Sequence, residues 1–166
     1  SELLFEDLLM PVLYPADIQD VFQLGLHGIA LSRFSGAWVG YKLLPETIET
    51  AASIRADHGQ IEIIRPRFDM PPGGLNSRNP DNIYLQEERL RQYKLPAAVA
   101  YARANRLNAV THDAPNARFG IAAMGKTWRD TLQALRDLGI EEDDLGALGI
   151  RILKIAMPFP VDEETY

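Results

Sequence analysis

The stretch FGIAAMGKTWRDTLQALRDLGI at 119–140, followed by LGIRILKIAMPF at 148–159, decides the fold class of this sequence. Residues 119–124 and 150–157 are almost continuously apolar, as the strands of a buried parallel sheet are. The residues between them have apolar positions at helical spacing, namely Trp128, Leu132, Leu135 and Leu138. Strand, helix and strand in this order predict a βαβ unit in the C-terminal half, with its sheet covered on both faces.

Local signals mark the ends of the helix expected at 126–139. Thr127 and Asp130 are expected to form a capping box at its start, and Gly139 to supply the left-handed residue at its end. The acidic run at 141–144 is expected to be a solvated start of the next helix.

Working outward, LNAVTHD at 107–113 predicts a further strand, and Asn82 is expected to cap a helix that begins near Ile83 and kinks or restarts at Pro96. The first half predicts a helix from Asp17 to about Ser32, a strand over 37–43, a short helix from 46 and an edge strand over 60–68. The fold class is therefore α/β, a parallel or mixed sheet with flanking helices.

The Pro- and Gly-rich residues 70–83 favour a turn-rich connection. We therefore expect three parts: an α/β unit over 1–69, a connector over 70–83, and a helix followed by a second α/β unit over 84–166. The acidic excess is concentrated before residue 84, which agrees with two different units.

Composition excludes several kinds of chemistry. The 166 residues include no cysteine, so this chain supplies no disulfide, no thiolate metal ligand and no iron–sulfur ligand. A net charge of −6 argues against nucleic acid as a partner, and no apolar run is long enough to span a membrane. We expect a cytoplasmic protein. The first residue is Ser1, which suggests a piece excised from a longer chain.

The segment from Gly120 to Thr127 matches the phosphate-loop pattern G-x-x-x-x-G-K-[ST]. Its four middle residues are apolar, so we interpret them as the buried strand, with Gly125 as a tight turn and Thr127 as a helix cap. Lys126 and Thr127 still follow the carboxyl end of a strand, where open α/β sheets bind ligands. They are candidates for contact with an anion.

The remaining polar residues form no catalytic constellation. His27, His58 and His112 are too scattered for a metal site, and we interpret His27 as a hydrogen-bonded structural group. His112 and Asp113 are neighbours at a strand end, but adjacent strand residues point to opposite faces. We therefore expect neither a catalytic residue nor a metal ligand.

Five stretches together resemble a known family: 26–42, 71–82, 87–108, 119–140 and 149–160. They are similar to the large single-chain indolepyruvate ferredoxin oxidoreductases, which belong to the thiamine-diphosphate-dependent 2-oxoacid:ferredoxin oxidoreductases. The resemblance implies that residues 1–69 end a pyrimidine-binding-like domain and that residues 84–166 begin a domain similar to the transketolase C-terminal domain.

The resemblance implies an enzyme that oxidatively decarboxylates aryl pyruvates to acyl-coenzyme A and passes the electrons to ferredoxin. Thiamine diphosphate, Mg²⁺ and [4Fe–4S] clusters would be bound by other parts of that parent chain, and the 166 residues alone would be inactive. Their role would be scaffold and assembly, with the remaining parent domains as partners and a homo-oligomer as the assembled form. The segments to watch are Arg33 to Trp38, which include Ser35, and Gly125 to Asp130.

An alternative function stays open. The chain could be a stand-alone α/β module that binds coenzyme A or a nucleotide at the helix start over 125–130. Nucleotide hydrolysis, which rests on the phosphate-loop pattern, ranks last.

Overall fold

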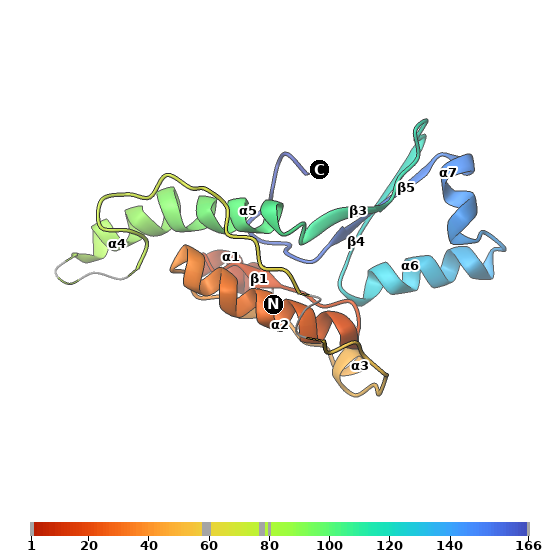
Figure 1. Ribbon diagram of the computed structural model, residues 1–166, viewed down its shortest axis with the longest axis horizontal. Helices are drawn as coiled ribbons and strands as arrows, with labels where there is room; N and C mark the ends of the chain where they lie inside the picture. The colour runs from red at the N-terminus through yellow and green to blue at the C-terminus, as the bar shows by residue number, and fades with distance from the viewer. Residues whose placement is uncertain (1, 58–60, 77–78, 80, 166) are drawn as a thin grey trace.

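The computed structural model describes residues 2–57, 61–76, 79 and 81–165. Figure 1 shows an elongated molecule. Helices α2 (Ile18–Ser35) and α5 (Leu95–Ala104) pack side by side in its middle, and a small sheet with helices α6 and α7 forms one end. The α/β fold class predicted from the sequence is confirmed.

The predicted βαβ unit is present. Strand β4 (Phe119–Met124) and strand β5 (Ile150–Ile155) pair in parallel, with α6 (Lys126–Asp137) between them in the chain. Strand β3 (Asn108–His112) pairs with the other edge of β5 in the antiparallel direction, so the strand order is β3-β5-β4 and the sheet is mixed.

The expectation that helices cover both faces of this sheet is wrong for β4. Ile121 and Ala123 pack toward α6 and α7 (Leu145–Leu148), which lie on one face. The alternate residues Gly120, Ala122 and Met124 are exposed on the other face. In the described part of the chain the two helices that follow β4 serve the same face, which leaves its second face open.

The start and end of α6 differ from the prediction. The N-cap is Gly125 and no side chain caps the helix, so the expected capping box between Thr127 and Asp130 is wrong. Gly139 does take the left-handed conformation, with φ +78°. Leu138 follows the helix and is 76% exposed, whereas Trp128 and Leu132 are buried as expected. The acidic run forms the short 3-10 helix Glu142–Asp144 that leads into α7.

The first half holds helix α1 (Glu2–Asp7), strand β1 (Val12–Leu13), α2, strand β2 (Gly40–Tyr41) and helix α3 (Pro45–Ile48). The helix expected from Asp17 is confirmed as α2, and Asp17 caps it by accepting a bond from the Asp20 N–H at 2.8 Å. The helix runs three residues past the expected end, because the left-handed residue that closes it is Gly36.

The strand expected over 37–43 is reduced to β2. Its partner β1 lies between Pro11 and Pro15, and proline has no N–H to donate, so the parallel ladder stays short.

The edge strand expected over 60–68 is wrong for its described residues, 61–68, which form no ladder. The side chain of Asn105 takes the place of a partner strand: it accepts from the Ile64 N–H and donates to the Ile64 carbonyl, both at 2.8 Å. A single amide therefore fixes this extended segment to the end of α5.

The helix expected from Ile83 is confirmed, with Asn82 as its cap. It consists of α4 (Ile83–Arg89), one π-helical turn over Leu90–Lys94, and α5. Pro96 lies in the first turn of α5, the part of a helix where a residue without an N–H destabilises it least. The predicted kink or restart of the helix is therefore a π-helical turn just before the proline.

Two clusters of buried apolar residues form the core. The larger contains residues from both sides of the 70–83 connector: Leu13, Leu24, Leu31, Phe34, Leu75, Ala97, Ala98, Tyr101, Ala102, Leu107, Ala156 and Met157. The smaller lies between the sheet and α6: Ala16, Ala123, Trp128, Leu132, Leu145 and Ile152. Backbone bonds from Val12 N to Phe159 O and from Tyr14 N to Ala156 O, at 2.9 and 2.8 Å, join the chain's two ends.

Candidate functional site

The turn between β4 and α6 carries the first pair of candidate residues, Lys126 and Thr127. The four middle residues of the phosphate-loop pattern belong to β4, so the prediction of a strand is confirmed, but Ala122 and Met124 are exposed, so the prediction that this strand is buried is wrong for them. Gly125 turns the chain with φ +53°, and a Cβ there would lie 2.4 Å from the ring of Tyr14. The turn therefore packs against Tyr14, the residue after β1, and leaves no room for a phosphate on that side of Gly125.

Both candidate side chains are engaged within the chain. The Lys126 ammonium donates to the Asp130 carboxylate at 2.5 Å, one helical turn away. The Thr127 hydroxyl donates to the Met124 carbonyl at 2.5 Å. An incoming phosphate would have to displace the carboxylate of Asp130.

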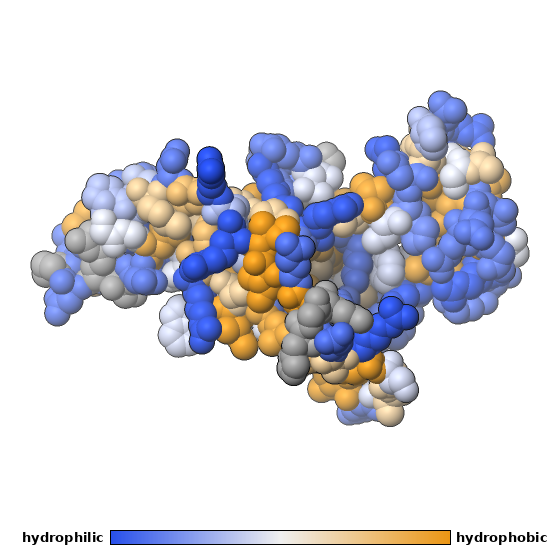
Figure 2. Space-filling model, viewed as in Figure 1, coloured by the Kyte–Doolittle hydropathy of each residue, from blue (hydrophilic) through white to orange (hydrophobic). Residues whose placement is uncertain are grey.

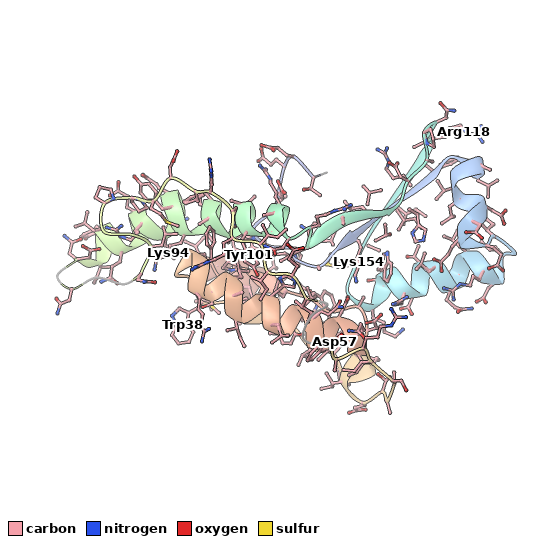
Figure 3. All side chains as sticks on the ribbon, viewed as in Figure 1. Trp38, Asp57, Lys94, Tyr101, Arg118 and Lys154 are labelled. Atoms are coloured by element: carbon pink, nitrogen blue, oxygen red, sulfur yellow. The ribbon has the colours of Figure 1, made fainter. Side chains whose placement is uncertain are left out.

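Two ion pairs join the C-terminal unit to α2, one from Arg129 at the start of α6 and one from Lys154 on β5. Arg129 donates through its Nε to Asp17 at 2.7 Å, and Lys154 donates to Asp20 at 2.8 Å. Both cations also lie over the ring of Trp128, at 4.6 and 4.7 Å from its centroid (Lys154 is labelled in Figure 3). Partial burial acts to raise the pKa of Asp17, but the bonds from the Asp20 N–H and Arg129 outweigh it and lower that pKa. Gly125 to Asp130 thus form a structural joint.

The second pair of candidates, Arg33 and Ser35, lies where α2 ends, but one side chain is exposed and the other is buried. Ser35 is fully buried; its hydroxyl donates to the Leu31 carbonyl at 2.8 Å and accepts from the Ala37 N–H at 3.2 Å. These bonds shape the turn that leads to Trp38. Arg33 is exposed and has no ion-pair partner among the described residues.

Arg33 lines the first hollow, a surface depression of about 710 Å³ along α2. Its wall on α2 is made largely of small residues, including Gly25, Gly28 and Ser32, and its far rim is Trp38. Trp38 is 83% exposed, and Figure 3 shows its side chain directed away from the body of the molecule. Apolar side chains also reach the surface over α2 and the segment crossing it (Figure 2), Ile29 and Ile63 among them.

The second hollow, of about 410 Å³, lies on the other side of Trp38. It is bounded by the residues after α1 and by the first part of the continuous helix that α4, the π-helical turn and α5 form. Arg89 and Lys94 line it together with Asp81 and Glu87. The Lys94 ammonium, at the end of the π-turn, donates to the Gly36 carbonyl at 2.9 Å. Burial, assisted by the charge of Arg89, lowers the pKa of Lys94. Arg89 and Lys94 are not among the candidates predicted from the sequence, where the nearby signal is Pro96, which marks the irregular turn.

The histidines behave as structural groups where the structure describes them. His27 Nδ1 lies 3.0 Å from the Tyr101 hydroxyl, which joins α2 to α5, and burial lowers the pKa of His27. His112 Nε2 lies 3.0 Å from the Glu142 carboxylate, whereas the neighbouring Asp113 pairs with Arg151. The predicted lack of direct pairing between His112 and Asp113 is confirmed. His58 lies outside the described residues.

Comparison with protein families gave a match for the C-terminal part of the chain. Residues 109–166, which hold β3 from its second residue onward, β4, α6, α7 and β5, match the family model described as the indolepyruvate oxidoreductase domain. The resemblance stated from the sequence is thereby confirmed for this part of the chain. A comparison with curated proteins gave no match.

Two further findings concern sites of other kinds. Within residues 2–57, 61–76, 79 and 81–165, no cluster of three or more His, Asp or Glu side chains could hold a metal ion. Among the same residues, no helix has the length and apolar character needed to cross a membrane.

Proposed function

We propose that this chain is a structural and assembly segment of an indolepyruvate ferredoxin oxidoreductase, an enzyme that decarboxylates aryl pyruvates to acyl-coenzyme A and passes the electrons to ferredoxin. The observation that carries the proposal is the match of residues 109–166 to the indolepyruvate oxidoreductase domain. On this proposal the partners of the chain are the other domains of the parent enzyme, in a homo-oligomer, and the parts 1–69, 70–83 and 84–166 belong to different domains.

The open side of β4 supports a role in assembly. β4 is the last strand in the order β3-β5-β4, and in the described residues no strand pairs with its outer edge. Its open face carries Gly120, Ala122 and Met124, all exposed and uncharged. Proteins normally cover or charge such an edge, because unpaired backbone groups and apolar side chains attract another chain. A further part of the parent enzyme would cover it.

The residues present do not fit the cofactors of such an enzyme. The chain has no cysteine to ligate an iron–sulfur cluster. The described carboxylates and imidazoles form no group that would hold Mg²⁺. We therefore assign no catalytic residue to this chain and place thiamine diphosphate, Mg²⁺ and the clusters in other parts of the parent enzyme.

A pair of matched substitutions tests the proposal. Ala122, on the open face of β4, and Ala134, on the exposed side of α6, are both exposed alanines in regular elements. Replacing either with lysine in the isolated chain should change the free energy of unfolding by less than about 0.5 kcal/mol, as surface substitutions usually do. In the parent enzyme only Ala122→Lys should lower indolepyruvate-dependent reduction of ferredoxin. Equal activities for the two variants would contradict the proposal.

Calorimetry on the isolated chain tests the alternative of a phosphate-binding module. We expect no binding of coenzyme A, ATP or thiamine diphosphate, because Lys126 and Thr127 are already engaged by Asp130 and Met124. Micromolar binding of coenzyme A or ATP that Lys126→Ala abolishes would favour the module instead.

A further inference from the structure

The segment over 61–65 is an extended stretch with one edge fixed and the other open. Asn105 bonds to both the N–H and the carbonyl of Ile64, and its amide also donates to the Tyr101 carbonyl at 2.9 Å. In an extended chain the backbone groups of neighbouring residues point to opposite edges. Those of Ile63 and Arg65 therefore point away from Asn105, and in the part of the chain that the structure describes they have no hydrogen-bond partner.

A third hollow, of about 540 Å³, is lined by this segment and by α2. Much of the apolar surface there is open to a partner, since Ile29 is 55% and Ile63 43% exposed, and Figure 2 shows apolar side chains gathered over α2 and the segment that crosses it. No carboxylate is part of the lining. The residues that the argument uses are Leu26, Ile29, Arg33, Ile61, Ile63 and Arg65.

The two arginines of the third hollow give it a local positive charge. Arg33 and Arg65 are both exposed, and neither has an ion-pair partner among the described residues. Glu62, the acidic neighbour of Arg65 in the sequence, lines a different hollow with His27 and Arg106. Unpaired guanidinium groups beside an apolar surface are complementary to a partner that carries carboxylates and apolar side chains together.

We infer that an extended acidic segment of another polypeptide adds as a strand along 61–65. Its apolar side chains fill the third hollow over α2, and its carboxylates pair with Arg33 and Arg65. Strand addition of this kind combines backbone bonds along an open edge with pockets for alternate side chains. Because Asn105 already holds the segment, little of it has to be ordered on binding.

The open backbone edge is the reason for assigning a peptide to this site. A small amphipathic acid could pair with the arginines and cover the apolar surface, but it would leave the backbone groups of Ile63 and Arg65 without partners. The inference is independent of the proposed function, since it concerns residues outside 109–166.

NMR titration of the isotope-labelled chain with a synthetic peptide tests the inference. The peptide Glu-Thr-Val-Thr-Val-Thr-Glu, blocked at both ends, has glutamate and valine on one face of a strand and reads the same in either direction of pairing. It should bind saturably, with a dissociation constant below about 1 mM. The same peptide with lysine in place of both glutamates should bind at least about tenfold more weakly, because like charges then meet.

The net charge of the chain makes this comparison strict. At −6 it favours the lysine peptide, so a preference for the glutamate peptide has to come from the local charge of Arg33 and Arg65. Absence of binding, or equal binding of the two peptides, would overturn the inference.

Hydrogen exchange distinguishes strand addition from binding by charge alone. The amides of Ile63 and Arg65 should exchange at least about tenfold more slowly with the peptide bound, whereas the amide of Ile64 already donates to Asn105 and should change less. A peptide N-methylated at both valines keeps the side chains but loses the donors that face the segment, so it should bind at least about tenfold more weakly. Unchanged exchange, or equal binding of the N-methylated peptide, would contradict strand addition.

Substitutions of the arginines locate the charge contacts. Arg33→Gln and Arg65→Gln should each weaken peptide binding about two- to fivefold, as the loss of an exposed ion pair does. Arg118→Gln is the matched control, because Arg118 is an exposed arginine at the tip of the sheet (Figure 3), and it should leave the affinity unchanged. Equal effects of the three substitutions would overturn the assignment of the carboxylates to Arg33 and Arg65.

Discussion

Asp162 fastens the residues after β5 to α5, and its replacement by asparagine should destabilise the whole chain. The Asp162 side chain is 2% exposed and accepts two bonds from Arg103 Nε, at 2.8 and 2.9 Å. It also accepts from the Thr165 hydroxyl at 2.6 Å. Asparagine has a similar shape but no charge, so Asp162→Asn removes the ionic part of these bonds and leaves the volume unchanged.

The expected loss follows from the burial of the two partners. Breaking a fully buried ion pair costs about 3–5 kcal/mol. The Arg103 side chain is 38% exposed, so water can replace part of the interaction with the carboxylate. We therefore expect the free energy of unfolding to fall by about 2–3 kcal/mol. Urea unfolding followed by circular dichroism measures it, and the slope against urea should be unchanged.

Glu164→Gln provides the control for this prediction. Arg103 also pairs with Glu164 at 2.7 Å, but the Glu164 side chain is 77% exposed, so this pair should contribute less than about 0.5 kcal/mol. A loss in Asp162→Asn no larger than in Glu164→Gln would refute the reasoning.

The destabilisation caused by Asp162→Asn should also depend on pH. The bonds from Arg103, and then those from Thr165 and the Glu164 N–H, lower the pKa of Asp162. The stability that ionised Asp162 contributes is therefore fully present above its unfolded pKa near 3.9 and is lost as pH falls through the lower folded pKa. Unfolding curves of the unaltered chain and of Asp162→Asn should converge as the solution is acidified, and a constant difference down to the acid limit would contradict this.

Three further predictions concern His27 and two glycines. Burial lowers the pKa of His27, so the free energy of unfolding should fall as pH drops below about 6.5, where the unfolded chain takes up a proton first. The His27→Gln variant should lack this fall in urea titrations. Gly25→Ala should raise the free energy of unfolding by about 0.5–1 kcal/mol, because alanine favours the helix and its Cβ would lie 3.8 Å from the Tyr41 hydroxyl, an ordinary contact. A lower melting temperature for this variant would contradict the prediction. Gly125→Ala should cost more than about 1–2 kcal/mol, since strained backbone adds to a Cβ contact of 2.4 Å with Tyr14; an unchanged melting temperature would contradict it.

Most features that depend on neighbouring residues could be predicted from the sequence, but not the start of α6, where the capping box expected between Thr127 and Asp130 is absent. The helix start at Asp17, the cap Asn82 and the left-handed Gly139 could be predicted, because each acts on backbone groups within four residues of itself. The βαβ unit follows for a similar reason, since its strands and helix are close in the chain and their apolar spacing is regular.

Features that depend on distant partners could not be predicted. Residues 61–68 have a strand-like sequence, but the amide of Asn105 holds Ile64 and no strand is available to pair with it. Lys126 was a candidate for ligand binding because the sequence does not show that Asp130 adopts the rotamer that pairs with it. The prominence of Trp38 likewise depends on the small residues of α2 beside it, which come together only in the folded chain.

The bonds that join Val12 to Phe159 and Tyr14 to Ala156 have a consequence for how the chain folds. Leu13, between them, packs in the same cluster as Met157, so the larger core closes only after Met157 has emerged from the ribosome. Contacts between residues so far apart in sequence slow folding, because a long loop must be ordered before they form. During synthesis α2 therefore emerges before α5, Ala156 and Met157, the residues that cover its apolar face.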